Sequence, residues 1–146
     1  MIHNIDLQTV MQESASPVYM DLVTRPTGRV VRERIERAFD ATGGPTVARM
    51  DFRGVGCMDY SCADEIVARL LRERPAVLLL VGLTDGHREA IEPVLIGHRL
   101  AVLVVQVDGT LDGLGTPEVA DELLEQLVTR GLADRLPGGM VALTAP

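Results

Sequence analysis

The chain has 146 residues, 47% hydrophobic and 24% charged, with a net charge of −7. This balance is typical of one globular domain and excludes a disordered chain. Only 3% of the residues are aromatic and all 14 basic residues are arginine. The core must therefore be aliphatic, and the acidic balance argues against nucleic acid and anionic membranes as partners.

No charged segment followed by an apolar run opens the sequence, so we expect no signal peptide. The longest apolar stretches, Ala76–Val81 and Leu100–Val105, are too short to span a bilayer. Two cysteines, Cys57 and Cys62, are too few for a disulfide framework. We expect a cytoplasmic protein with reduced thiols.

In the N-terminal part, Ile5–Met11 alternates weakly and is expected to be a first edge strand or a loose terminus. Val18–Val23 alternates clearly and predicts a strand, which Pro26–Gly28 interrupts. Arg29–Phe39 has apolar residues at helical spacing, with Gly43–Pro45 ending the helix. Four arginines of this helix alternate with glutamates and are expected to face solvent: Arg29, Arg32, Arg34 and Arg37.

In the central part, Val47–Phe52 predicts a strand, and a helix is expected to open at Ser61 and to close at Pro75. Ser61 is the expected N-cap, because Asp64 three residues later approximates a capping box. The nearly continuous apolar run Ala76–Leu83 predicts a strand covered on both faces.

A further helix is expected from Asp85, with Pro93 causing a late start or a kink. Leu100–Val107 then predicts another central strand. Strands that alternate with helices indicate an α/β fold with a mixed, largely parallel sheet of four to five strands and covering helices. We assign this architecture to residues 1–107.

Residues 108–146 are predicted to form an extension packed on or beside that domain. A glycine-containing loop follows Asp108, a helix is capped by Thr116 and ended by Gly131, and a short β-wing turns at Pro137–Gly139. The acidic side chains here argue against DNA binding. A role as a lid, a dimer contact or a docking surface fits this acidic extension better than DNA binding does.

Polar residues are densest in Gly54–Ile66, where a strand turns into a helix. In α/β sheets such turns are exposed and converge on one crevice. A hydroxyl at the helix N-terminus, here that of Ser61, can receive a phosphate that meets free backbone N–H groups. A purely structural interpretation, in which the polar residues cap the helix, explains most of them equally well.

The run MDFRGVGCMDYSCADEIVARL resembles the central motif of STAS domains, the regulatory domains of sulphate transporters and anti-sigma factor antagonists. Asp51 matches the strand-end aspartate, Met58 the apolar residue, Asp59 the motif aspartate, and Ser61 the phosphorylated serine or threonine. Tyr60 replaces a small hydroxyl residue and Cys62–Ala63 replaces Gly-Leu, so the chain looks like a divergent member. The order of elements agrees through Val107.

The resemblance implies a non-enzymatic regulatory module without a cofactor. Its partner would be a protein, an ATP-binding kinase-like regulator, and phosphorylation of Ser61 would be the switch. The residues implied in partner binding lie in one turn and helix: Met58, Asp59, Tyr60, Ser61, Cys62, Asp64 and Glu65.

Two other functions stay open. One is a structural domain that dimerises through residues 116–146 without a switch. The other is an enzyme or small-ligand binder using Asp59, Ser61 and the thiols, although both cysteines are expected to be small buried hydrophobes. The cysteines, with His87 and His98 distant, do not make a zinc pattern, and we expect those histidines at the surface or at helix ends.

Overall fold

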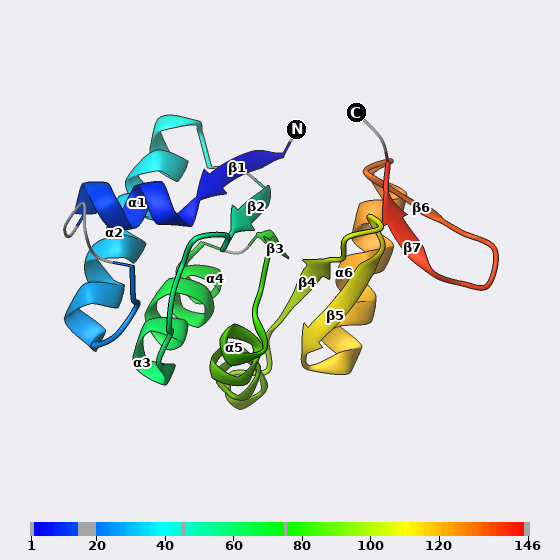
Figure 1. The fold of residues 1–146 in the computed structure, drawn as a ribbon. Helices are drawn as coiled ribbons and strands as arrows, with labels where there is room; N and C mark the ends of the chain where they lie inside the picture. The colour runs from blue at the N-terminus through cyan, green and yellow to red at the C-terminus, as the bar shows by residue number, and fades with distance from the viewer. Residues whose placement is uncertain (1, 15–19, 45, 75, 145–146) are drawn as a thin grey trace.

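The computed structural model describes residues 2–14, 20–44, 46–74 and 76–144. Its centre is a five-stranded sheet in the order β1-β2-β3-β4-β5 (Figure 1). The strands β1 to β4 are parallel to one another, and β5 is antiparallel to β4. Their bounds are His3–Asp6, Val47–Asp51, Val77–Val81, Ala101–Val105 and Leu111–Gly115. The predicted α/β class with a mostly parallel sheet is confirmed.

The helices that connect β1 to β4 pack on one face of this sheet. They are α1 (Leu7–Ser14), α2 (Arg25–Ala41) and α5 (Asp85–Gly97), together with one continuous helix between β2 and β3. This continuous helix consists of α3 (Tyr60–Ala63), the π-helical segment η1 (Asp64–Arg69) and α4 (Leu70–Glu73). Each parallel strand is added on the same side of its predecessor. Right-handed crossovers then place every connection on the same face. The larger hydrophobic core, mostly aliphatic but including Phe39 and Phe52, lies between this layer and the sheet.

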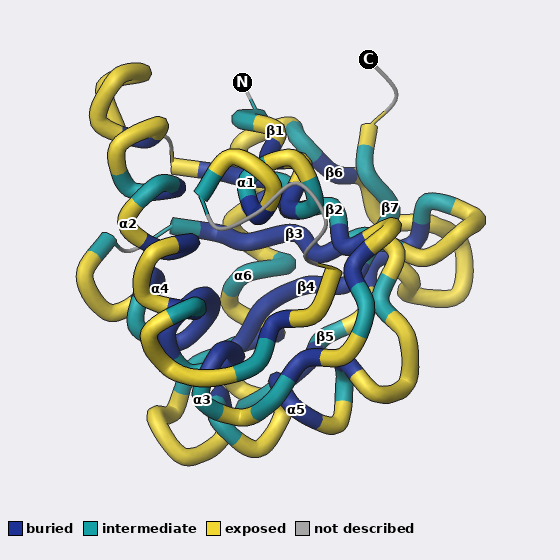
Figure 2. Tube along the Cα trace, turned by 60° about the vertical axis from the view of Figure 1, so that its left-hand side comes forward, coloured by how far each residue is buried: buried dark blue, intermediate teal, exposed yellow. Residues whose placement is uncertain are grey.

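The opposite face is covered by α6 (Pro117–Thr129) and by the hairpin of β6 (Ala133–Arg135) and β7 (Val141–Leu143). The antiparallel turn from β4 to β5 reverses the chain direction and delivers it to that face. A second core, which includes Leu79, Leu103 and Leu127, lies beneath. Figure 2 shows β3 and β4 buried along their length between the two layers.

The central strands predicted at Val47–Phe52, Ala76–Leu83 and Leu100–Val107 are confirmed, each slightly shorter than predicted. The predicted first strand, Ile5–Met11, is wrong in extent because the chain becomes helical at Leu7. In the predicted strand Val18–Val23, the described residues make only an isolated parallel bridge between Leu22 and Met58. Val18 and Tyr19, like the predicted helix stops Pro45 and Pro75, lie outside the described residues.

The start of α2 was predicted too late. Pro26 lies in the first turn of the helix, where a backbone N–H has no partner within the helix, so its missing N–H does not interrupt the helix. The helix α5 begins at Asp85, without the predicted late start, and Pro93 lies inside it.

The loop predicted after Asp108 contains the strand β5, and a hairpin forms at the predicted wing. In β5 the absence of a side chain at Gly113 is required, since a Cβ atom there would lie 2.6 Å from that of Ala120 on α6. The predicted boundary between an α/β domain and a C-terminal extension at residue 107 stays a prediction. The strand β5, which follows this boundary in the chain, pairs with β4 and so belongs to the same sheet.

Candidate functional site

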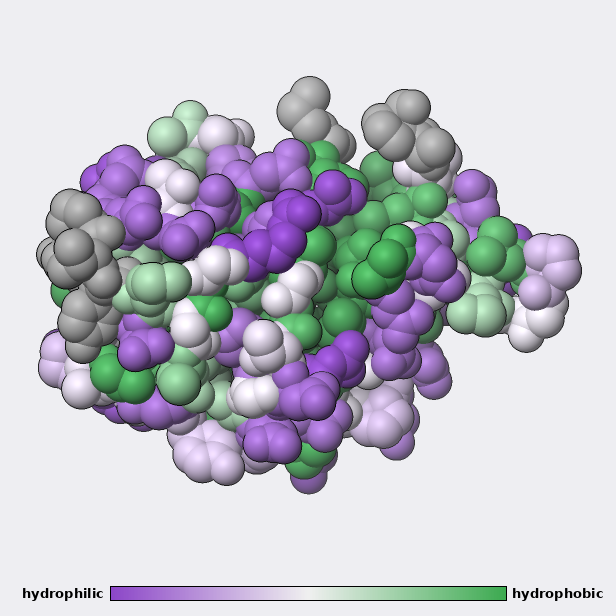
Figure 3. Space-filling view, viewed as in Figure 1, coloured by the Kyte–Doolittle hydropathy of each residue, from purple (hydrophilic) through white to green (hydrophobic). Residues whose placement is uncertain are grey.

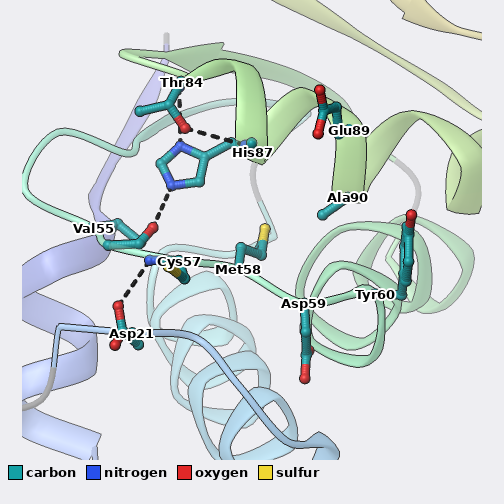
Figure 4. Close-up of a pocket in the computed structure, with 12 residues that line it drawn as sticks. Asp21, Val55, Cys57, Met58, Asp59, Tyr60, Thr84, His87, Glu89 and Ala90 are labelled. Carbon is teal, nitrogen blue, oxygen red and sulfur yellow. Dashed lines mark hydrogen bonds between the residues drawn. The ribbon is translucent and has the colours of Figure 1, made fainter.

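A cleft of about 600 Å³ lies beyond the carboxyl ends of β2 and β3 (Figure 4). One wall is the loop Val55–Asp59, which leads from β2 into α3, together with Tyr60 at the start of α3. The other wall is the first part of α5, from Thr84 to Ala90, and Asp21 lies beside the loop. The predicted crevice at the strand-to-helix turn is therefore present, with a second wall from a distant part of the chain.

The loop wall is held by pairing with the segment Met20–Leu22. The backbone N–H of Leu22 donates to the carbonyl of Cys57 at 2.7 Å, and the N–H of Gly56 donates to the carbonyl of Met20 at 2.6 Å. The carboxylate of Asp21 accepts from the N–H of Cys57 at 2.8 Å. A Cβ atom at Gly56 would overlap the Asp21 carboxylate, so a larger residue there would displace Asp21 from its bond to the Cys57 N–H.

His87 joins the two walls. Its Nδ1 atom lies 3.1 Å from the N–H of Thr84, which can only donate, so Nδ1 must accept and carry no proton. Nε2 then carries the hydrogen and donates to the Gly56 carbonyl at 2.7 Å. The Thr84 hydroxyl completes a capping box with His87. His87 is at a helix end, as predicted, but it is buried and not at the surface.

The helix at the site begins at Tyr60, and its N-cap is Asp59 and not Ser61 as predicted. Oδ1 of Asp59 accepts from the Cys62 N–H at 2.9 Å and from the Ser61 hydroxyl at 2.8 Å. Oδ2 accepts from the Thr24 N–H at 2.9 Å. Burial opposes ionisation of Asp59, but these hydrogen bonds, led by those from the Cys62 and Thr24 backbones, hold its pKa below the ordinary value.

Thr24 is bound to this cap in a strained conformation. Its φ of 70° and ψ of 141° are unusual for a β-branched residue and cost about 1–3 kcal/mol. Asp59 binds its N–H, and the Cys62 thiol donates to its carbonyl at 3.1 Å. The N-terminus of α3 therefore holds the N-terminus of α2 in place.

The seven residues predicted to bind a partner differ widely in exposure. Tyr60 is 63% exposed and lines the cleft. Met58 also lines the cleft and is mostly buried, whereas Cys62 and Glu65 are fully buried behind it. The remaining three are half-buried: Asp59, Ser61 and Asp64. Only part of the predicted surface is thus accessible.

Glu65 faces α2 and not the cleft. It accepts hydrogen bonds from Nε of Arg32 at 3.0 Å and from Arg25 at 3.1 Å, and Arg32 also pairs with Glu36 and Glu73. Arg32 is 5% exposed, so its predicted solvent exposure is wrong. Burial opposes ionisation of Glu65, but the guanidinium groups of Arg32 and Arg25 outweigh it and lower the pKa of this carboxyl.

The two cysteines have different environments. Cys62 is buried, as predicted, and burial together with the nearby Asp59 carboxylate raises the pKa of its thiol to about 12. It is therefore protonated at neutral pH and is not a nucleophile. Cys57 is exposed in the cleft, so its predicted burial is wrong.

The sequence alone missed Asp21, His87 and Glu89, which line the cleft from positions far from the motif. Among the described residues no cluster of His, Cys, Asp or Glu could hold a metal ion. Each helix within the described ranges is too short or too polar to span a bilayer. Comparisons with known protein families, curated proteins and solved structures find no match.

Proposed function

We propose that the chain is a non-enzymatic, STAS-like regulatory module that binds a protein partner, an ATP-binding kinase-like regulator, at the cleft beside Tyr60. The observation that carries the proposal is the exposed aromatic side chain of Tyr60 at the edge of a preformed cleft. Tyrosines in such positions often carry much of the binding free energy of protein interfaces. Free cysteines suit a cytoplasmic location.

The non-enzymatic role is supported by the chemistry of the candidate groups. The Cys62 thiol is protonated and donates to a carbonyl. The two nitrogens of His87 and both oxygens of Asp59 are occupied by hydrogen bonds within the fold. These groups hold the loop and the helix start in place.

Phosphorylation of Ser61 is the proposed switch. Transfer of a phosphoryl group from ATP to Oγ, with release of ADP and the hydroxyl proton, would end the donation from Ser61 to Asp59. It would also place negative charge beside Asp59 and Asp64. Repulsion would then loosen the Asp59 cap, which holds Thr24, and change the wall of the cleft.

Affinity capture from an extract of the native host tests the proposal. Wild type should retain an ATP-binding protein that Tyr60→Ala retains about tenfold less, a loss of the size expected for one of the few interface residues that dominate binding. The matched control is Ile96→Ala, since Ile96 is also exposed but lies outside the cleft. Equal capture by Tyr60→Ala and wild type would contradict docking at this cleft.

The switch is tested separately by phosphopeptide mass spectrometry of protein from its native host. A phosphate on Ser61 in at least one growth condition is expected, and Ser61→Asp should lower capture while Ser61→Ala should not. Complete absence of the modification, with equal capture by both variants, would contradict the switch and leave the docking proposal standing.

Dimerisation through the C-terminal part is a second candidate, favoured by exposed apolar side chains there. Leu136 and Met140 of the hairpin are 39% and 51% exposed, and Figure 3 shows hydrophobic surface toward the end of the molecule that carries the hairpin. Changing both residues to serine should lower the mass measured by light scattering if they join two copies. An unchanged mass would exclude this contact.

A further inference from the structure

The cleft combines an apolar floor with acidic groups. Val55, Met58 and Ala90 form buried parts of the lining. Three carboxylates, those of Asp21, Asp59 and Glu89, also line it, and none of its described lining residues is an arginine. In Figure 4, Glu89 and Tyr60 lie on either side of Ala90, while Asp21 lies across the cleft.

These carboxylates differ in what they can still bind. Asp59 uses both oxygens within the fold. Asp21 uses Oδ1 for the Cys57 N–H, and no described residue donates to its Oδ2. Glu89 is exposed on α5, and it makes no hydrogen bond or ion pair with the part of the chain that the structure describes. Of the three carboxylates, Glu89 and Asp21 are thus the two with an oxygen that no described residue occupies.

The complementary ligand is a cation on a slender apolar stem. Arginine has this shape, because three methylene groups can lie along Met58 and Ala90 while the charged end stays at the rim. Its planar guanidinium can bind a carboxylate through two parallel hydrogen bonds and can stack on an aromatic ring. Lysine offers a point charge without that geometry and fits less well.

We propose that the cleft receives an arginine side chain of the partner protein, with its guanidinium on Glu89 beside Tyr60. This inference rests on the proposed function, because it names the chemistry by which the partner is recognised. It also gives Glu89, which lies outside the STAS-like motif, the role of a specificity residue.

The test uses the full, ¹⁵N-labelled chain and two probes, Nα-acetylarginine amide and Nα-acetylcitrulline amide. Citrulline has the same stem but an uncharged urea end, so the pair isolates the charge. The arginine probe should shift the backbone resonances of Gly56, Cys57 and Gly86 in a saturable manner. The citrulline probe should bind about threefold to tenfold more weakly, as expected for one partly exposed charge-assisted contact.

Two variants on α5 provide the matched comparison. Glu89→Gln should weaken the arginine probe about threefold and leave the citrulline probe unchanged. Glu92→Gln removes another exposed carboxylate of the same helix, outside the cleft, and should change neither. Equal binding of both probes to wild type, or equal effects of the two variants, would overturn the proposal.

Failure of this inference can be told apart from failure of the proposed function. If Tyr60→Ala abolishes partner capture while the two probes bind equally, docking at the cleft stands and the arginine is wrong. If the arginine probe binds selectively while Tyr60→Ala captures as wild type does, the cleft takes a free guanidinium compound. That result would overturn both proposals about the partner.

Discussion

The carboxylate of Asp59 accepts the backbone N–H of Thr24 at 2.9 Å, across 35 positions of sequence. The same carboxylate caps α3. One side chain therefore sets the start of two helices, and the loop wall of the cleft lies directly before it. The stability of the site should depend on this residue more than on Ser61.

Replacing Asp59 by alanine should lower the free energy of unfolding by about 2–3 kcal/mol, because a helix cap and two further hydrogen bonds are lost. Ser61→Ala should cost under about 1 kcal/mol, since it removes a single donor. Urea denaturation measures both, with Asp121→Ala on the exposed side of α6 as control. Equal stability of Asp59→Ala and the control would refute the role of this cap.

Thr24→Gly should raise the free energy of unfolding by up to about 1 kcal/mol, because glycine adopts a positive φ without the steric cost of a Cβ. Part of that gain is offset by the greater freedom of glycine in the unfolded chain. Thr24→Ala keeps the Cβ and should give no gain. A glycine variant no more stable than the alanine variant would show that the conformation is unstrained.

Glu65→Gln should destabilise the fold by about 3 kcal/mol, because it leaves the buried guanidinium of Arg32 with less compensating charge. The double variant Arg32→Met with Glu65→Leu should recover much of that loss. Thermal unfolding of the single and double variants measures the difference. Additive losses in the double variant would contradict a coupled pair.

The pH dependence of stability follows from the same pair. The folded-state pKa of Glu65 lies below its ordinary value of 4.5, so its ionised form stabilises the fold above about pH 4.5 and this contribution is lost as the pH falls through the folded pKa. Urea midpoints between pH 7 and 3 should therefore fall less steeply for Glu65→Gln than for wild type. Parallel curves would contradict this.

Iodoacetamide at pH 8 should alkylate Cys57 in the folded protein and leave Cys62 unmodified, because Cys57 is exposed and the Cys62 thiol is buried with a pKa of about 12. Mass spectrometry of digested protein distinguishes the two sites. Both should react once the chain is unfolded in urea. Rapid reaction of Cys62 in the native state would show that the N-terminus of α3 opens readily.

The central strands could be predicted because their apolar runs are nearly uninterrupted. The strand β5 could not, since Asp112, Gly113 and Gly115 replace the alternating apolar pattern. Gly113 makes room for Ala120, and Gly115 lies at φ 108°, where a Cβ would lie 2.6 Å from the carbonyl oxygen of Leu100. These glycines serve packing between distant elements, which a local pattern does not reveal.

At the site, the sequence predicted the place of the turn but misassigned its cap and its exposed residues. Asp59 and Ser61 are both favoured N-cap types two positions apart, so local preference does not decide between them. The burial of Glu65 depends on Arg32, which lies 33 positions earlier in the chain. The second wall of the cleft, carrying His87 and Glu89, comes from another helix altogether.

The order of the strands bears on how the protein folds. Each of β2 to β5 pairs with the strand made immediately before it. During synthesis every new strand therefore meets an edge that has already left the ribosome, and no strand has to wait for a distant partner or be inserted between two existing ones. The sheet can grow in one direction as the chain emerges, because each of the three parallel pairings closes the loop of a single crossover and the antiparallel β4–β5 pairing closes only a short turn.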